Sequence, residues 1–175
     1  MKLVVGGLLV LAGVGAGTDL LACGNKFLLV SRGTRFGKVA AARHPATILL
    51  YVNRASALPE ALGKVPIEAI LSKAGYQPTT VSDPAELEQA LRQGGWDLVL
   101  ADLADSAALR DRLQGDGAPM VVPVVYQPAR GVEKQAKKDY GRVLRAPFKG
   151  QRLLETIDEA VAVRVELQEK AAAAD

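Results

Sequence analysis

The sequence is poor in the residues from which many catalytic and metal sites are built. Its 175 residues include one cysteine, Cys23, and one histidine, His44. One cysteine excludes an intramolecular disulfide and a cysteine-based zinc site, and one histidine excludes a multi-histidine metal centre. No G-x-S-x-G motif occurs, and neither Cys23 nor His44 falls at the end of a predicted strand. A hydrolase with a nucleophile and a base is therefore not expected, and no cofactor is expected either.

Aromatic residues and net charge are also low. The net charge is +3 and aromatic residues make up 5% of the chain. A surface that binds single-stranded nucleic acid needs aromatic side chains interleaved with basic ones so that bases can stack, and no such cluster occurs. Nucleic acid is therefore not expected as a partner.

The N-terminus has the features of an export signal. Lys2 precedes an apolar run from Leu3 to Gly17, and small and apolar residues continue up to Cys23. This run is shorter than the roughly 20 residues that span a bilayer. We therefore predict a cleaved signal peptide over residues 1–22.

The stretch "LLAC", Leu20 to Cys23, resembles the lipobox of bacterial lipoproteins. The resemblance implies that Cys23 is diacylated, so that the exported protein is anchored to a membrane and faces the periplasm. Gly24, rather than aspartate, after the cysteine favours the outer membrane by the sorting tendency of that class. Leu21 and Asp19 depart from the usual lipobox. The alternatives are a plain signal peptide with a free cysteine, and an uncleaved anchor.

A basic tether over residues 23–45 follows the lipobox cysteine. No acidic residue occurs between Asp19 and Glu60, whereas the basic residues there are Lys26, Arg32, Arg35, Lys38, Arg43 and Arg54. Beside a lipid anchor such a segment can lie on anionic head groups. A solvated linker that repels itself and stays extended fits the same composition.

From residue 46 onward, short apolar runs alternate with segments of helical spacing, which is typical of an α/β domain with a parallel sheet. Strands are predicted in "TILLYV", "YQPTTVSD", "DLVLAD", "MVVPVVY" and "RVLRA". Helices are predicted in "VPIEAILSKAG", "DPAELEQALRQGG", "SAALRDRLQG", "GVEKQAKKDYG" and "QRLLETIDEAVAVRVELQ". This alternation predicts one doubly wound domain over residues 46–169. It is a three-layer αβα fold of flavodoxin type with a five-stranded parallel sheet in the order 2-1-3-4-5.

Single residues predict local details. Asp83 is expected to cap the second helix, with Glu86 completing a capping box. Asp105 is expected to cap the third helix. Pro123 is expected to cause a bulge or a strand end, because proline donates no hydrogen bond to a ladder. Residues 170–175 are expected to form a disordered tail.

The order of these elements and two motifs resemble the receiver domain of response regulators over nearly all of residues 46–168. "WDLVLADLAD" is similar to the receiver's third strand, with Asp102 at the position of the phosphoacceptor aspartate. "RVLRAPFKGQRLLETI" is similar to the fifth strand and last helix, with Pro147 and Phe148 matching the Pro-Phe pair that follows the family's lysine. Asp102 falls at the carboxyl end of a strand, where such sheets bind their ligands.

The sequence departs from the receiver pattern at each of the partners of the phosphoacceptor. Asn53 and Arg54 replace the two acids that help to hold Mg²⁺, and Ala146 replaces the lysine. No serine or threonine for the switch position occurs from Ala107 to Glu155. Phosphoryl transfer depends on positioning and charge neutralisation, so these losses predict a site without metal and without chemistry. Asp102 is then a degenerate phosphoacceptor that caps a helix or stabilises a loop.

These observations predict a non-enzymatic pseudo-receiver that is anchored in the cell envelope and binds another protein. The candidate surface is the basic face of Lys134, Lys137, Lys138 and Arg142, for which a solvated helix face is the alternative interpretation. An unknown envelope protein and a homodimer are the expected partners. The alternative function is a divergent receiver of a phosphorelay, phosphorylated on Asp102.

Overall fold

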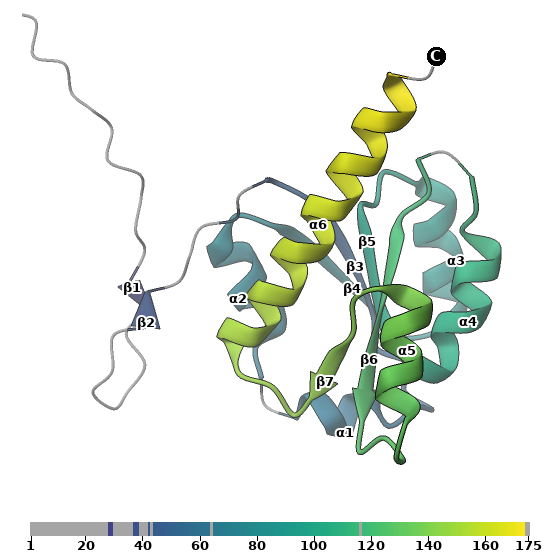
Figure 1. Ribbon diagram of the computed structural model, residues 1–175. Coiled ribbons are helices and arrows are strands. Elements are labelled where there is room, and N and C mark those ends of the chain that lie inside the picture. Colours follow the sequence, from purple (N-terminus) through teal and green to yellow (C-terminus); the bar gives the residue numbers. More distant parts are fainter. Residues whose placement is uncertain are drawn as a thin grey trace, which may run out of the picture.

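The structure is a computed structural model that describes residues 28–29, 37–38, 42, 44–63, 65–115 and 117–173. Its main sheet contains β3 (Thr47–Tyr51), β4 (Gln77–Val81), β5 (Leu98–Asp102), β6 (Met120–Tyr126) and β7 (Leu144–Ala146). The five strands are parallel in the order β4-β3-β5-β6-β7, which is the predicted 2-1-3-4-5 order (Figure 1). Two further strands, β1 (Leu28–Leu29) and β2 (Gly37–Lys38), pair antiparallel with each other.

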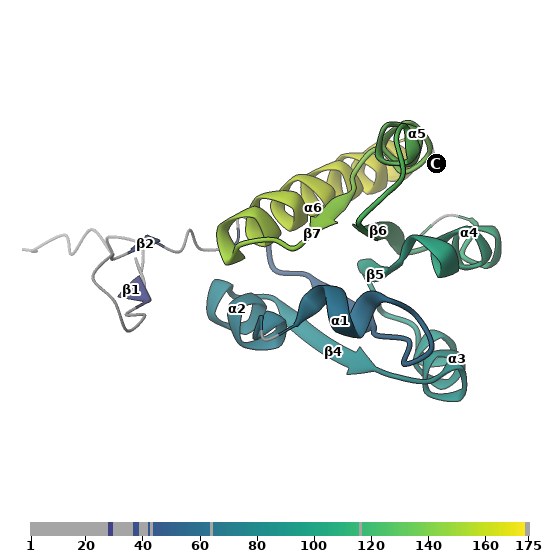
Figure 2. The same cartoon turned by 90° about the horizontal axis from the view of Figure 1, so that it is seen from below.

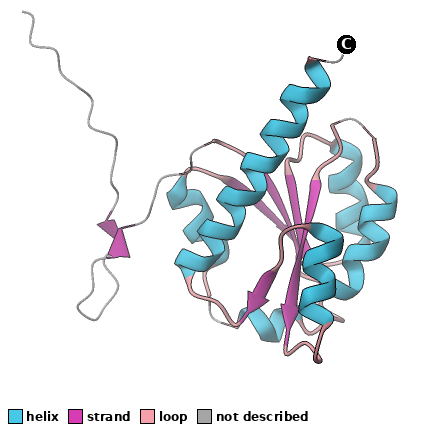
Figure 3. Ribbon diagram, in the orientation of Figure 1, coloured by secondary structure: helices cyan, strands magenta, loops and turns pink. Residues whose placement is uncertain are grey.

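The helices are α1 (Leu58–Leu62), α2 (Ile67–Ala74), α3 (Pro84–Gln93), α4 (Leu103–Arg112), α5 (Val132–Tyr140) and α6 (Gly150–Ala172). Residues of α2 and α6 pack on one face of the sheet, and residues of α3, α4 and α5 pack on the other (Figure 2). Strands and helices alternate along this part of the chain, as Figure 3 shows by colour. The predicted doubly wound α/β fold in three layers is confirmed.

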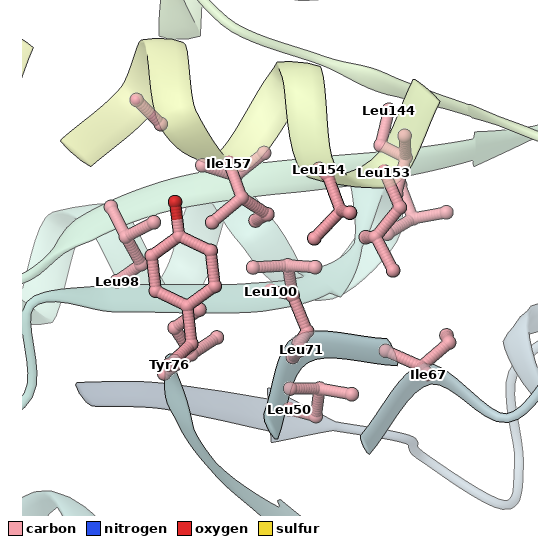
Figure 4. Packing of buried hydrophobic residues seen from close by; sticks show 14 of the residues in the cluster. Leu50, Ile67, Leu71, Tyr76, Leu98, Leu100, Leu144, Leu153, Leu154 and Ile157 are labelled. Carbon is pink, nitrogen blue, oxygen red and sulfur yellow. The ribbon is translucent and has the colours of Figure 1, made fainter. Parts of the chain in front are cut away.

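The core follows from the alternation of side chains along each strand. Ile48 and Leu50 of β3 face α2 and α6, whereas Leu49 and Tyr51 face α3 and α4. All four are buried, because helices cover both faces of the sheet. Figure 4 shows the larger side of the core, where Leu50, Leu98 and Leu100 of the sheet lie beside residues of α2 and α6.

Helix α1 was not predicted from the sequence. It lies at the end of the domain toward which the β6 and β7 arrowheads point (Figure 1), and it crosses in front of the strands when the domain is seen from below (Figure 2). Leu58 and Ala61 of α1 are buried in the same cluster as Leu50 and Leu144. A short helix therefore covers part of the carboxyl edge of the sheet.

The expected bulge or strand end at Pro123 is wrong. The register between β5 and β6 runs without interruption from Leu98↔Met120 to Asp102↔Val124. The N–H of Met120 donates to the carbonyl of Asp97 on the β5 side, so Pro123, three residues on, turns its nitrogen toward β7. Because β7 pairs with β6 only from Val124 onward, no carbonyl of β7 is left without a partner by the N–H that Pro123 lacks.

Two helix boundaries also differ from the expectation. Helix α4 begins at Leu103, directly after β5, and its N-cap is Asp102 rather than Asp105. Helix α6 continues through Ala172, so residues 170–172 are helical and not a disordered tail. Asp83 caps α3 as predicted, with Oδ1 2.9 Å from both the Ala85 and the Glu86 nitrogen. The predicted capping box differs, because Glu86 accepts from the N–H of Ser82, one residue before the N-cap, at 2.8 Å.

Candidate functional site at the carboxyl edge of the sheet

Asp102 ends β5 at the edge where parallel sheets of this kind bind ligands. Its Oδ1 accepts a hydrogen bond from the N–H of Ala104, at 2.9 Å, and so caps α4. The hydroxyl of the fully buried Ser106 donates to the Asp102 carbonyl at 2.7 Å. One oxygen of the Asp102 carboxylate is thus bonded to the start of α4, because α4 follows β5 with no intervening loop.

Asn53 lies beside the same edge, two residues after β3. Its Nδ2 is 3.1 Å from Oδ2 of Asp105, and its Oδ1 accepts from the N–H of Ala55 at 2.9 Å. Arg54 is exposed, and its backbone N–H lies 3.4 Å from the Ser82 carbonyl. The receiver resemblance implies metal-binding acids at this position. Asn53 instead supplies a neutral amide, which donates a hydrogen bond to the Asp105 carboxylate.

At the end of β7, Ala146 is buried and Pro147, joined to it by a cis peptide bond, is exposed. The neighbouring cation, Arg145, is paired with Glu133 on α5, with Nη1 3.0 Å from Oε2. In residues 44–63, 65–115 and 117–173, no ion pair joins Asp102 to a lysine or an arginine. Asp102 is therefore not neutralised by Arg145 or by another described cation.

Helix α1 fills the same end of the sheet with apolar side chains. Leu58 is 2% exposed and lies, together with Leu62, around a small apolar gap that Val124, Leu144 and Phe148 also line. These residues come from β6, β7 and the loop before α6. Leu58 therefore packs at the carboxyl ends of the strands, on the face of the sheet that α2 and α6 cover.

The electrostatics of the edge agree with this arrangement. The pKa of the buried Tyr51 hydroxyl is raised, first by burial and then by the nearby carboxylates of Asp105 and Asp83. Within the part of the chain that the structure describes, no three acidic, histidine or cysteine side chains are grouped so that they could hold a metal ion. The edge carries a local negative potential without a cluster of cation ligands.

The basic face predicted on α5 is only partly available. Lys137 is paired with Glu133 at 2.7 Å, and Arg142 is paired with Glu159 at 2.9 Å. The hydrogen bond from Lys137 is the largest of the effects that lower the pKa of Glu133. Lys134 and Lys138 are exposed and take part in no ion pair with another described residue. These two lysines are the free cations of the predicted surface.

A polar network at the opposite, amino edge was also missed from the sequence. Arg164, in α6, is 8% exposed, and its guanidinium donates to Oδ1 of Asp97 at 3.3 Å, to the Gly117 carbonyl at 2.8 Å and to the Ala118 carbonyl. Oδ2 of Asp97 accepts from the N–H of Thr47 at 2.8 Å. The network ties α6 to the starts of β3, β5 and β6. A signal was present, because Arg164 falls within the apolar stripe of α6.

The predicted signal peptide, Cys23 and most of the basic tether lie outside the described residues. None of the helices formed by the described residues has the length and apolar character needed to span a bilayer. The export and anchoring of the chain therefore remain predictions from the sequence.

Comparisons with known proteins agree with the fold. No family model and no curated protein matches the sequence. Among solved structures, the chain is similar to a response regulator from Thermotoga maritima, with a TM-score of 0.51 and 17% identity over 67% of this chain and 98% of that one. It is also similar to an orphan response regulator of H. pylori, with a TM-score of 0.50 and 15% identity over 69% of this chain and 98% of that one. About two thirds of this chain thus has the fold of a response-regulator receiver domain.

Proposed function

We propose that the protein is a non-enzymatic pseudo-receiver, anchored in the cell envelope through Cys23, that acts by binding another protein and does not accept a phosphoryl group. The observation that carries the proposal is the state of Asp102. Its carboxylate caps α4, and the nearest position that should supply a metal ligand holds Asn53, which is bonded to Asp105.

Three further features support the loss of phosphoryl transfer. Ala146 and Pro147 bring no cation to the edge, and Arg145 is paired with Glu133. The end of β6 consists of Val124, Val125 and Tyr126. The phenol of Tyr126 is the only hydroxyl among them, and no serine or threonine is present for a switch. Phosphoryl transfer is achieved almost entirely by positioning and charge neutralisation, so an aspartate without these partners does not react.

The test is incubation of the full chain with acetyl phosphate and Mg²⁺, followed by intact-mass measurement. We expect no phosphorylated species beyond that of the Asp102→Asn variant, while a receiver domain with a complete set of acids, switch hydroxyl and lysine is phosphorylated in parallel. A Mg²⁺-dependent adduct that Asp102→Asn abolishes would contradict the proposal and support the alternative, a divergent phosphorelay receiver.

Anchoring is tested separately by metabolic labelling with a fatty acid in a bacterial host. We expect label on the wild-type chain and none on Cys23→Ser, because the chain has no other cysteine. Label that persists in Cys23→Ser, or that never enters the wild type, would remove the envelope from the proposal and leave the pseudo-receiver.

Partner binding is proposed for the free cations Lys134 and Lys138 of α5, which fit an acidic partner surface. Membrane extracts are passed over the wild type, over Lys134→Glu/Lys138→Glu and over a matched control, Lys73→Glu/Arg92→Glu, which reverses two exposed charges on α2 and α3. We expect the α5 variant alone to lose the bound protein. An unchanged set of bound proteins would exclude this surface.

A further inference from the structure

A groove at the amino edge of the sheet is used by neither the candidate site nor the proposed function. It is open, has a volume of about 890 Å³, and lies between the end of α6, the start of β6 and the facing residues of α4 and α5. Leu113, Met120 and Leu167 supply much of its apolar lining. Leu167 is 56% exposed, the highest value among the large apolar side chains of the described residues.

One wall of the groove is the part of α6 that extends past the sheet. A helix of 23 residues is about 34 Å long, whereas the seven-residue strand β6 spans about 23 Å. About two turns of α6 therefore project beyond the sheet, as Figure 1 shows at the C-terminal end. Arg164, at the edge of the sheet, and Leu167, Gln168 and Ala171 of the projecting turns line the groove, which is the spacing of one helix face.

The projecting turns match the groove in size. A helix about 10 Å wide that rises about 1.5 Å per residue occupies roughly 120 Å³ per residue. The groove therefore has room for roughly seven residues of helix, or two turns. The projecting segment of about two turns has a comparable volume.

The charges also match. The guanidinium of Arg110 stands on the wall opposite α6, 4.8 Å from the centre of the Tyr140 ring, and it forms no ion pair with another described residue. Arg164, the other cation of the groove, is bound to Asp97. Glu166 and Glu169 are exposed on the side of α6 that faces away from its own groove. Asp139 on the Arg110 wall and Lys170 on the outer side of α6 carry opposite charges as well.

We infer that a second copy of this chain places the end of its α6 in this groove, and that the exchange is reciprocal. In a two-fold arrangement the groove-lining faces of the two α6 ends pack on each other. The outer side of each end, with Glu166 and Glu169, then meets Arg110 of the other copy. Each copy then contributes both its groove and the outer side of its α6 end, so the contact is reciprocal, as a closed dimer requires. The inference goes beyond the proposed function and depends on neither the phosphorylation state nor the anchor.

A charge exchange tests the contact. Sedimentation equilibrium of the full chain in density-matched detergent is measured for the wild type, Arg110→Glu, Glu166→Arg/Glu169→Arg and the combination of all three changes. We expect a wild-type dimer, a dissociation constant at least about tenfold higher in each partial variant, and recovery in the combination. Arg112→Glu is the control, because Arg112 lies on the same helix but is paired with Glu88 outside the groove.

A wild-type chain that stays monomeric overturns the inference, and so does a dimer whose dissociation constant the charge exchanges leave unchanged. If the wild type is monomeric, the groove would instead fit an acidic helix of a different protein. All three positions are exposed, so the variants are expected to fold. Disulfide trapping gives a second readout in a Cys23→Ser background. Gln168→Cys should form a covalent dimer on mild oxidation, whereas Glu155→Cys, on the exposed side of α6 far from its end, should not. Equal trapping of both would contradict the proposed contact.

Discussion

Nδ2 of Asn53 lies 3.1 Å from Oδ2 of Asp105, so a neutral amide joins the loop after β3 to the first turn of α4. The bond satisfies the carboxylate without adding negative charge to an edge that already holds Asp83 and Asp102. The receiver pattern has acids at this point of the chain. An acid at position 53 would place its carboxylate within contact distance of the Asp105 carboxylate.

Asn53→Asp should therefore destabilise the domain at neutral pH by about 1 kcal/mol, through the lost hydrogen bond and the repulsion of Asp105. Urea denaturation measures the change, and Gln93→Glu, which adds the same charge at an exposed position, is the control. If Mg²⁺ restores the stability of Asn53→Asp, the edge has kept the geometry of a cation site and the amide is what prevents its use. If Asn53→Asp is as stable as the wild type, the hydrogen bond between Asn53 and Asp105 does not contribute to stability.

Leu58→Ala should cost about 2 to 4 kcal/mol, because Leu58 is 2% exposed and its removal leaves a cavity among Val124, Leu144 and Phe148. Glu60→Ala, on the exposed side of α1, should change the free energy of unfolding little. Equal and small effects of both substitutions would mean that α1 does not cover the strand ends in solution.

Arg164→Met should destabilise the domain by about 3 kcal/mol. It keeps most of the side-chain length but leaves the Gly117 and Ala118 carbonyls and the Asp97 carboxylate without their common donor. Arg152→Met is the matched control, since the Arg152 side chain is 59% exposed and lies 3.5 Å from Glu155. Chemical denaturation of the two variants side by side decides between a structural tie and a dispensable surface contact.

Tyr76 gives a prediction about alkaline pH. Its hydroxyl is buried and donates to Asp158, and burial, then the hydrogen bond, then the charge of Asp158 raise its pKa far above the usual range. In the unfolded chain the tyrosine loses its proton near pH 10. The unfolded state therefore releases the proton first, and the stability that Tyr76 contributes is complete below about pH 10 and declines above it.

Tyr76→Phe removes one hydrogen bond and should cost about 1 kcal/mol at neutral pH. Because phenylalanine does not titrate, the difference in unfolding free energy between the wild type and Tyr76→Phe should shrink above about pH 10. Urea denaturation at a series of pH values measures it. A difference that stays constant up to strongly alkaline pH would argue against the buried hydrogen bond.

Much of the fold was predictable because its signals are local. The apolar runs of β3, β5 and β6 need no partner to be identified, since strands buried on both faces carry apolar residues throughout. Asp83 and Pro84 mark the start of α3 by the chemistry of a helix N-terminus. The pattern failed at Pro123, where tolerance of a proline depends on the absence of a neighbouring strand on one side. It also failed at α1, whose five residues are too few to show a helical period.

The sequence by itself determined the order of the elements, and with it the edge at which Asp102 falls and the absence of a lysine, a switch hydroxyl and a pair of acids around it. Only the tertiary structure decided what these residues do there. It placed Asn53 against Asp105 and Leu58 at the strand ends, because these contacts join residues distant in the sequence. For Asp102, which the sequence predicted to cap a helix or stabilise a loop, it showed that the bonded group is the N–H of Ala104. Pairing across the sheet, and not local propensity, sets the distances from Asn53 to Asp105 and from Leu58 to the strand ends.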